Sequence, residues 1–240
     1  MLFIITIWTV RVMAIVKVSW SGGKDSTCAS LLHILRGDKA KLVCYIPMFT
    51  KEIPLITKKH YEFIINTAEY FRMLGADVYI VSGMTYYDFV SHKRTRGENK
   101  GKAMGFPPYI EKMCPFKNYS KESAIKKCDV GFYDYEDIGI AFDEPNRQGQ
   151  LNDFKRSILV EKQYTELMAK QKCIEYNILS PHYENDTRDG CALCPHAPIK
   201  RREQWFIDYP EAIPLVIELQ NLVKRECPER APLRNKQWFL

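Results

Sequence analysis

The stretch IVKVSWSGGKDSTCASLLHIL, residues 15–35, joins an apolar run to a glycine-rich turn and then to an amphipathic segment. A short, β-branched apolar run is typical of a buried parallel strand, and the apolar spacing after the turn is helical. The turn residues are Ser21, Gly22, Gly23, Lys24, Asp25 and Ser26. This is more than one helix cap needs; paired glycines let a backbone approach a ligand, and amides at a helix start attract phosphate. The stretch therefore predicts a phosphate-binding loop between a strand and a helix.

The same alternation of strand and helix continues downstream. Strands are predicted over residues 41–49, 76–83 and 136–144, and helices over 25–35 and 56–74. Strands that alternate with helices indicate a doubly wound, mostly parallel α/β sheet. The rest of the chain is expected to form a helical, cysteine-bearing C-terminal part. In such sheets ligands bind at the carboxyl ends of the strands, which is where the glycine turn lies.

Three parts are expected along the 240 residues. Residues 1–12 form an N-terminal extension, 13–157 the nucleotide-binding α/β domain, and 158–240 a helical region with a C-x-x-C loop. Met13 offers an alternative translation start. The first twelve residues lack the basic segment and cleavage site of a signal peptide, and no run reaches the roughly 20 apolar residues of a membrane helix. A cytoplasmic protein without membrane contact is expected.

The charge balance is mildly basic, with a formal net charge of +6 and a sequence pI near 8.8. This suits a polyanionic ligand such as ATP or a nucleic acid. The segment 92–108 is rich in Lys, Arg and Gly and has no apolar period. It is predicted to be a solvated loop; the alternative is that its cations order around a polyphosphate or a nucleic acid.

Eight cysteines in a chain without a secretory signal favour metal binding or reactive thiols over disulfides. Cys191 and Cys194 form a C-x-x-C pair, which is half of a four-ligand site. Cys128 and His196 are alternative fourth ligands. The expected ligands of Zn²⁺ or a [4Fe–4S] cluster are Cys114, Cys173, Cys191 and Cys194.

The segment SGGKDS after an N-terminal strand resembles the PP-loop of the adenine nucleotide α-hydrolase-like superfamily. The later segments GFP, MCPFK, IGIAFDE, SILVE, TELMA, ILSPHYE and RDGCALCP resemble, in order, a branch of the phosphoadenosine phosphosulfate reductase family, over about residues 13–209. The resemblance implies ATP or a sulfonucleotide as ligand, and sulfur chemistry. The branch is also similar to the PP-loop component of DNA phosphorothioation systems, which carries a cysteine-bound iron–sulfur cluster. The tail ECPER with Cys227 lacks the Gly and His of the Glu-Cys-Gly-Ile/Leu-His nucleophile segment found in assimilatory reductases.

Roles follow for the loop residues. The amides of Gly22, Gly23 and Lys24 and the hydroxyls of Ser21 and Ser26 are expected to hold the phosphates. Asp25 is expected to cap the helix and to help hold Mg²⁺. The candidate catalytic residues are Asp25, Lys117, Arg147 and Arg188. The three cations among them are expected to stabilise negative charge that develops on an α-phosphate or sulfate.

The expected function is an enzyme that binds an adenine nucleotide and acts at its α-phosphate or sulfonyl end, in phosphoadenosine phosphosulfate reductase-like sulfur chemistry. The first alternative is an ATP-pyrophosphatase-type enzyme that inserts sulfur into nucleic acid, like DNA phosphorothioation or tRNA thiolation enzymes. The second is a non-catalytic nucleotide-binding module. The expected partners are the nucleotide together with a nucleic acid or a sulfur-donor or redox protein.

Overall fold

A computed structural model describes residues 14–107, 114–184 and 190–230 of the chain. Its centre is a five-stranded sheet in which every neighbouring pair is parallel, in the order β3-β2-β1-β4-β5. The predicted α/β class with a doubly wound parallel sheet is thereby confirmed. The strands are β1 (Ile15–Trp20), β2 (Lys39–Tyr45), β3 (Asp77–Val81), β4 (Tyr135–Ile138) and β5 (Lys155–Arg156).

The strand order reverses at β1. Val18 of β1 pairs with Leu42 of β2 on one side and with Asp137 of β4 on the other. The chain therefore leaves β1 toward one edge of the sheet and returns from β3 to build the other. In open α/β sheets the crevice at such a reversal, outside the carboxyl ends of the strands, is the preferred place for a ligand. The residues that leave β1 and β4 face this crevice.

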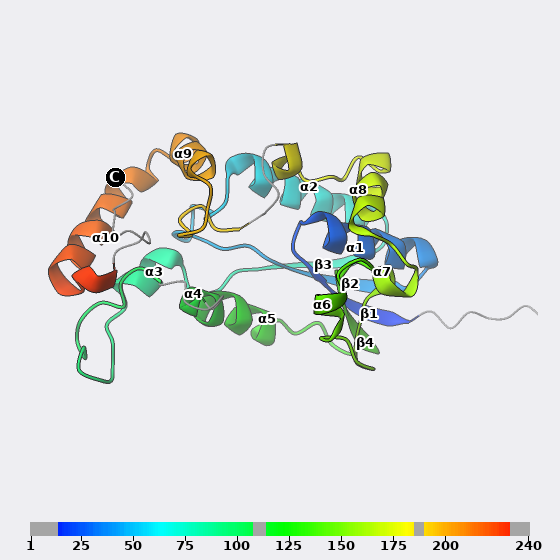
Figure 1. Ribbon diagram of the computed structural model, residues 1–240, viewed down its shortest axis with the longest axis horizontal. Helices are drawn as coiled ribbons and strands as arrows, with labels where there is room; N and C mark the ends of the chain where they lie inside the picture. The colour runs from blue at the N-terminus through cyan, green and yellow to red at the C-terminus, as the bar shows by residue number, and fades with distance from the viewer. Residues whose placement is uncertain (1–13, 108–113, 185–189, 231–240) are drawn as a thin grey trace, which may run out of the picture.

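Helices cover both faces of the sheet (Figure 1). One face carries α1 (Lys24–Arg36), α2 (Lys58–Met73), α7 (Ile158–Glu161) and α8 (Glu166–Glu175). The other carries α4 (Pro115–Lys117), a π-helical turn (Asn118–Glu122) and α5 (Ser123–Lys127). A short α6 (Pro145–Gln148) follows β4. Farther from the sheet lie α3 (Tyr86–Ser91), α9 (Ile199–Asp208) and α10 (Ala212–Glu226). Within the described ranges, no helix is long and apolar enough to cross a bilayer.

Local signals set most element boundaries. Gly37 ends α1 in the left-handed conformation, with φ of 85°, which glycine adopts at little cost. Thr165 begins α8, and its hydroxyl accepts the amide of Met168. The strand expected over 136–144 is shorter than its apolar run suggests, because the backbone turns at Gly139 and the amide of Ile140 bonds to the carbonyl of Ile138.

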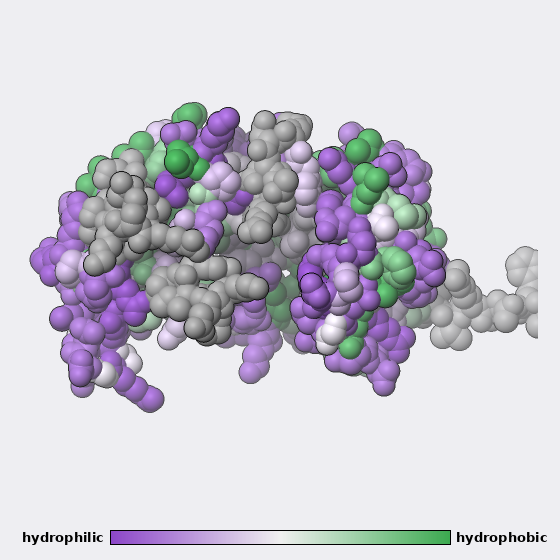
Figure 2. All heavy atoms as spheres, in the orientation of Figure 1, coloured by the Kyte–Doolittle hydropathy of each residue, from purple (hydrophilic) through white to green (hydrophobic). Residues whose placement is uncertain are grey.

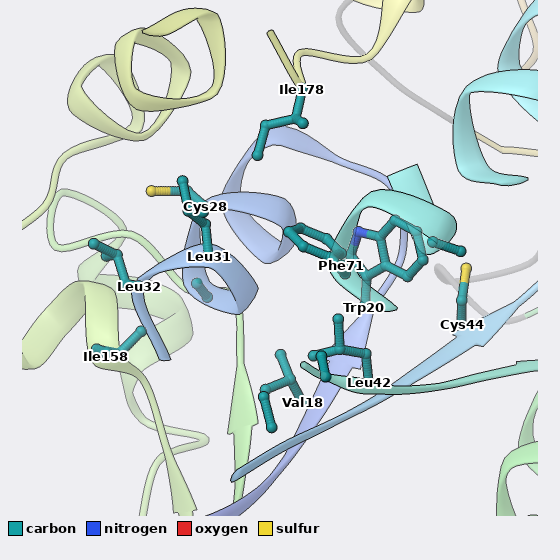
Figure 3. Close-up of a cluster of buried hydrophobic side chains, with 14 of the residues drawn as sticks. Val18, Trp20, Cys28, Leu31, Leu32, Leu42, Cys44, Phe71, Ile158 and Ile178 are labelled. Carbon is teal, nitrogen blue, oxygen red and sulfur yellow. The ribbon is translucent and has the colours of Figure 1, made fainter. Parts of the chain in front are cut away.

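The main core lies between β1 and the helices above it (Figure 3). Val16, Val18 and Trp20 alternate along β1 and are almost fully buried, so this face of the strand is packed against α1 and α2. The Trp20 indole donates to the Thr27 hydroxyl of α1 at 3.0 Å. The same core takes in Ile158 and Ile178. The packing of the sheet layer thus continues through α7 and α8, past the boundary expected at residue 157.

A second apolar core lies beyond the carboxyl end of β2. Phe49, which follows β2, packs edge-on against Trp205 of α9 with ring centroids 5.3 Å apart. The Trp205 indole donates to the Pro54 carbonyl at 2.8 Å, and α10 adds Val216 and Val223. In Figure 1, α3, α9 and α10 gather on the left, and β1 and β4 lie on the right. The protein therefore has two separately packed apolar cores, one on each side of the crevice.

A buried polar cluster joins β4 to the helices. The Asp137 carboxylate is fully buried, accepts the Ile158 amide at 2.6 Å and lies 3.0 Å from Nε2 of His33. Nδ1 of His33 lies 2.8 Å from the Asp38 carboxylate. Because a buried carboxylate without partners is costly, this cluster fixes α1 and α7 relative to β4.

Candidate functional site

The predicted phosphate-binding loop lies at the reversal point of the sheet. The Ser21 amide donates to Oγ of Ser26 at 3.1 Å, and the two hydroxyl oxygens are also 3.1 Å apart. The Ser26 hydroxyl donates to the Gly23 carbonyl at 3.1 Å. In this structure the serine side chains bond to the loop itself and hold its shape, which leaves ligand binding mainly to backbone amides.

Gly22 and Gly23 let the loop pass close to α2 and begin α1. Gly22 has a φ of +79°, and a Cβ there would lie 3.0 Å from Cγ1 of Ile64. Gly23 is the N-cap of α1, and no side chain caps the helix at this position. Asp25, which was expected to be the cap, instead directs its carboxylate to Lys24. The first amides of α1 are therefore available to partners from other segments or to a ligand.

Gly139 is a site residue that sequence reasoning missed. A Cβ at this position would lie 2.6 Å from the Ser26 amide nitrogen and 2.7 Å from its Cα. The turn after β4 thus presses directly on the first turn of α1, at a separation that only glycine permits. The signal was present in the sequence, as a glycine inside the predicted strand EDIGIAFDE, where an isolated glycine marks a close approach of another backbone.

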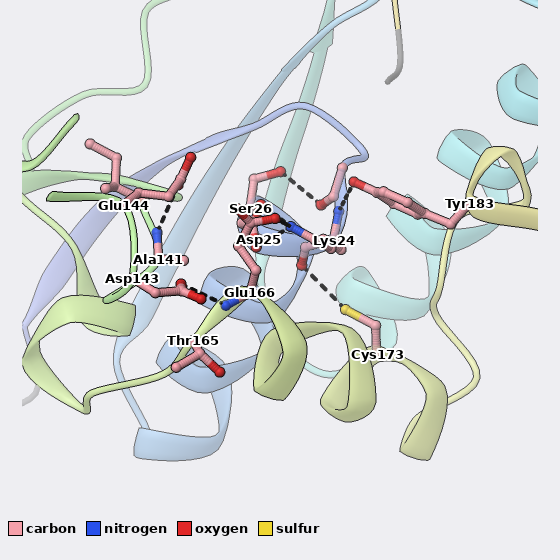
Figure 4. A network of polar contacts seen from close by, with 12 residues as sticks. Lys24, Asp25, Ser26, Ala141, Asp143, Glu144, Thr165, Glu166, Cys173 and Tyr183 are labelled. Atoms are coloured by element: carbon pink, nitrogen blue, oxygen red, sulfur yellow. Dashed lines mark hydrogen bonds and ion pairs between the residues drawn. The ribbon is translucent and has the colours of Figure 1, made fainter. Parts of the chain in front are cut away.

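Charged side chains surround the loop (Figure 4). Nζ of Lys24 lies 2.8 Å from the Asp25 carboxylate and 2.6 Å from that of Glu166. Burial disfavours the ammonium, but its bonds to these two carboxylates outweigh that cost and raise the pKa of Lys24. Burial also raises the pKa of Asp25, with added repulsion from Glu166 and Glu144. Glu144, at the end of the fourth predicted strand, and Glu166, which was not predicted, make this side of the loop acidic.

A cavity of about 380 Å³ opens between the loop and the second core. Its lining combines one residue of the glycine-rich loop with apolar side chains, two lysines and three cysteines. The apolar part includes Pro47, Ile56, Ile64 and Phe116. The polar part includes Ser21, Tyr45, His60, Tyr86, Cys114, Lys117, Lys121, Cys191 and Cys194.

Three of the four predicted metal ligands line this cavity. Cys191 and Cys194 lie on one turn, which the Ala192 amide holds to the Leu55 carbonyl at 2.8 Å. Cys114 approaches from the segment before α4. Burial, together with the nearby Cys194 and Cys114, raises the pKa of the Cys191 thiol to about 12. Burial likewise raises the pKa of Cys114.

Cys173 lies elsewhere. It is fully buried in the main core, and its thiol donates to the Lys24 carbonyl at 3.3 Å (Figure 4). The alternative ligand Cys128 ends α5 beside Asp129, and His196 is exposed. Among the residues the structure describes, no group of three or more His, Cys, Asp or Glu side chains is arranged to hold a metal ion. Cys114, Cys191 and Cys194 thus line the same cavity, but their side chains are not arranged as metal ligands.

The predicted catalytic cations separate. Lys117 lines the cavity and lies 3.1 Å from the Glu122 carboxylate, and Lys121, which was not predicted, joins it there. Arg147 of α6 is half exposed and pairs at 2.8 Å with Glu144, the N-cap of the same helix. Arg188 lies outside the described residues.

No protein-family model matches this chain, and no curated protein matches it. The family resemblance therefore rests on the motifs named above.

Replacement of Gly139 by Ala tests the close contact between the turn after β4 and the glycine-rich loop, residues 21–26. We expect Gly139→Ala to lower the free energy of unfolding by about 1–3 kcal/mol, because overpacking forces backbone shifts. Gly149→Ala is the matched control, since a Cβ there meets nothing within 4 Å. Urea unfolding measures both variants, and equal unfolding midpoints would contradict the contact.

Proposed function

We propose that this protein is an enzyme that binds the phosphates of an adenine nucleotide at residues 21–26. It would act at the α-phosphate or sulfonyl end in sulfur chemistry similar to that of the phosphoadenosine phosphosulfate reductase family. One observation carries the proposal: Ser21 of the phosphate-binding loop and the thiols of Cys114, Cys191 and Cys194 line one cavity. A nucleotide anchored at the loop would extend toward sulfur ligands rather than toward bulk water.

The phosphates would be held by the amides of Gly22, Gly23 and Lys24, at the positive end of the α1 dipole. The carboxylates of Asp25, Glu144 and Glu166 oppose a polyanion at this place. Mg²⁺ fits this donor set because it takes carboxylate and phosphate oxygens, and when bound it would offset the phosphate charge. The Lys24 ammonium, which the carboxylates of Asp25 and Glu166 now hold, would then be free to bind phosphate.

The cavity provides for the rest of the nucleotide. Its apolar walls at Pro47, Ile56 and Ile64 suit a base. Lys117 and Lys121 would stabilise charge that develops as a bond to phosphorus or sulfur breaks. Arg147 is not among the residues that line this cavity, so its proposed part in the reaction loses geometric support.

Cys114, Cys191 and Cys194 would hold a metal ion or cluster. Thiolates suit both zinc and iron–sulfur clusters, so the donor chemistry fits even though the free thiols are not arranged as a closed ligand set. Bound there, zinc would supply structural support and an iron–sulfur cluster would supply electron transfer. The protein's part would be to supply three partly buried thiols, which lose their protons when the metal binds.

Nucleotide binding should depend on Lys24. We expect Lys24→Ala to raise the Kd for ATP with Mg²⁺ about tenfold, because the variant cannot make a charge-assisted hydrogen bond to phosphate and leaves the carboxylates of Asp25 and Glu166 without their counter-charge. Lys39→Ala, at an exposed position at the start of β2, is the control.

Calorimetry with ATP, adenosine phosphosulfate and phosphoadenosine phosphosulfate measures the affinities, and a pyrophosphate assay measures turnover. Failure to bind any of these nucleotides would overturn the proposal. Tight ATP binding without turnover, with any candidate acceptor, would indicate the non-catalytic module.

Metal binding should depend on the three cysteines that line the cavity and not on Cys173, the fourth predicted ligand. We expect protein purified without oxygen to contain zinc or iron and sulfide, and Cys191→Ser to lose both the metal and thermal stability. Cys173→Ser, which keeps a donor to the Lys24 carbonyl, should retain the metal. Metal analysis and visible absorbance distinguish zinc from an iron–sulfur cluster. Metal-free wild-type protein, or equal loss in both variants, would contradict this assignment.

The same site should lose metal at low pH. Binding requires thiolates, and the pKa of Cys191 is raised to about 12 by burial and that of Cys114 is also raised. Protons therefore compete more strongly as pH falls, and apparent affinity should rise with pH by up to about tenfold per unit for each thiol. Chelator competition across pH measures the slope, and a flat profile would exclude thiolate ligation.

A second candidate function, sulfur insertion into nucleic acid, is favoured by an ordered basic arm. Residues 92–108 were expected to form a solvated loop, but within residues 92–105, called the arm here, Lys93 pairs with Ala103 in an antiparallel bridge. The Glu226 carboxylate of α10 accepts a hydrogen bond from Nζ of Lys93 at 2.6 Å and another from the Ala103 amide at 2.8 Å. The arm projects from the molecule (Figure 1), and Figure 2 shows its surface as hydrophilic. Arg96, Lys100 and Lys102 are exposed on it.

The buried position of Cys227 points the same way. This thiol ends α10 and is fully buried, and a Cβ on Gly105 would lie 2.9 Å from its sulfur. A reductase nucleophile must reach the sulfonucleotide, and the thiol here is enclosed by the base of the arm. The ATP-dependent alternative needs no such nucleophile.

Charge reversal on the arm tests this candidate. We expect Arg96→Glu with Lys100→Glu to weaken RNA or DNA binding. The affinity should also depend less steeply on salt concentration, because about one counterion fewer is released for each phosphate that the arm no longer neutralises. Lys126→Glu with Lys127→Glu, on exposed positions of α5, is the control. Fluorescence anisotropy over a salt series measures both pairs. Equal binding of the arm variant and the wild type would show that the arm takes no part in nucleic-acid binding.

A further inference from the structure

The motif ILSPHYE places a short segment over the phosphate-binding loop. Residues 180–183, called the strap here, follow α8 and include the start of a 3₁₀ turn (Pro181–Glu184). The hydroxyl of Tyr183 accepts the backbone amide of Lys24 at 3.0 Å (Figure 4). Lys24 is the first residue of α1, whose N-cap Gly23 supplies no side chain. A phenol oxygen therefore occupies a helix-start amide of the kind that binds phosphate oxygens.

Ring contacts hold the strap in this position. The His182 ring stacks on that of His60 of α2, with centroids 4.9 Å apart and an interplanar angle of 24°. The His182 ring also lies against the Tyr183 ring, with centroids 4.1 Å apart. Nδ1 of His182 lies 2.6 Å from the Ser180 hydroxyl and 3.1 Å from Nδ1 of His60. The hydroxyl of Tyr183 is thus aimed at the loop by a built stack rather than by a single flexible side chain.

We propose that the Tyr183 hydroxyl is an internal competitor of the nucleotide. It takes the place of a phosphate oxygen at the Lys24 amide, and it leaves that amide when a phosphate binds. The inference rests on the proposed nucleotide function of residues 21–26. Because His60 also lines the cavity with Cys114, Cys191 and Cys194, the departure of the strap is transmitted to the wall of that cavity.

The test compares Tyr183→Phe with the wild type, using inorganic pyrophosphate and ATP with Mg²⁺ as probes. Phe keeps the ring stack and removes only the competing acceptor. We expect the Kd for both probes to fall about two- to tenfold, the effect of one hydrogen bond no longer made in the free protein. Tyr133→Phe is the matched control, because Tyr133 lies beside Lys17 near the start of β1.

Hydrogen exchange on the wild-type protein gives a measurement that needs no variant. We expect pyrophosphate to leave the Lys24 amide protected, since one acceptor replaces another, and to speed exchange in residues 180–183. Protection of the strap by pyrophosphate would show that Tyr183 closes onto the ligand and would overturn the inference.

The binding outcomes separate the two proposals. Wild-type binding with an equal or higher Kd for Tyr183→Phe would overturn the competitor role alone. Absence of binding of both probes to wild type and variant would overturn the nucleotide function and the inference together. A lower Kd in the Phe variant, with the Tyr133 variant unchanged, would support both.

Discussion

The buried carboxylate of Asp137 is the contact on which the arrangement of the site depends. It lies on β4, accepts the amide that begins α7 and lies against His33 on α1. A carboxylate with no exposure to water requires such partners, so these elements cannot shift independently. Two residues farther along, Gly139 lies against the first turn of α1. The orientation of the glycine-rich loop, residues 21–26, is therefore set by its contacts with the sheet before any ligand is present.

Several polar groups of the loop already have partners in the free protein. Ser21 and Ser26 bond to each other, Lys24 binds Asp25 and Glu166, and the Lys24 amide binds Tyr183. A ligand must exchange these bonds for its own, so its affinity is a difference between two bonded states. This arrangement keeps the loop ordered without a ligand, and in the proposed function a phosphate would replace the partners of the ammonium and of the amide.

The cavity exists because two apolar cores are packed separately. The first holds the sheet, α1, α2, α7 and α8; the second holds α3, α9 and α10 around Phe49 and Trp205. Ser21 and Tyr45, at the carboxyl ends of β1 and β2, line the cavity between these cores, and Cys114, Cys191 and Cys194 line it as well. Polar and sulfur-bearing groups from distant parts of the chain therefore share one space whose remaining wall is apolar.

Local sequence determined the four longer strands, the main helices and the loop, because periods of two and 3.6 residues, caps and glycine turns act over a few residues. It also placed Cys191 and Cys194 together, since they are three residues apart. It did not indicate β5, which is two residues long. Only the tertiary structure decided that Cys173 faces the Lys24 carbonyl, that Gly139 touches Ser26, and that Glu166 and Tyr183 reach Lys24. These contacts depend on how α8 and the following segment pack over the sheet. That packing is set by the summed burial of side chains far apart in the chain, which no local pattern records.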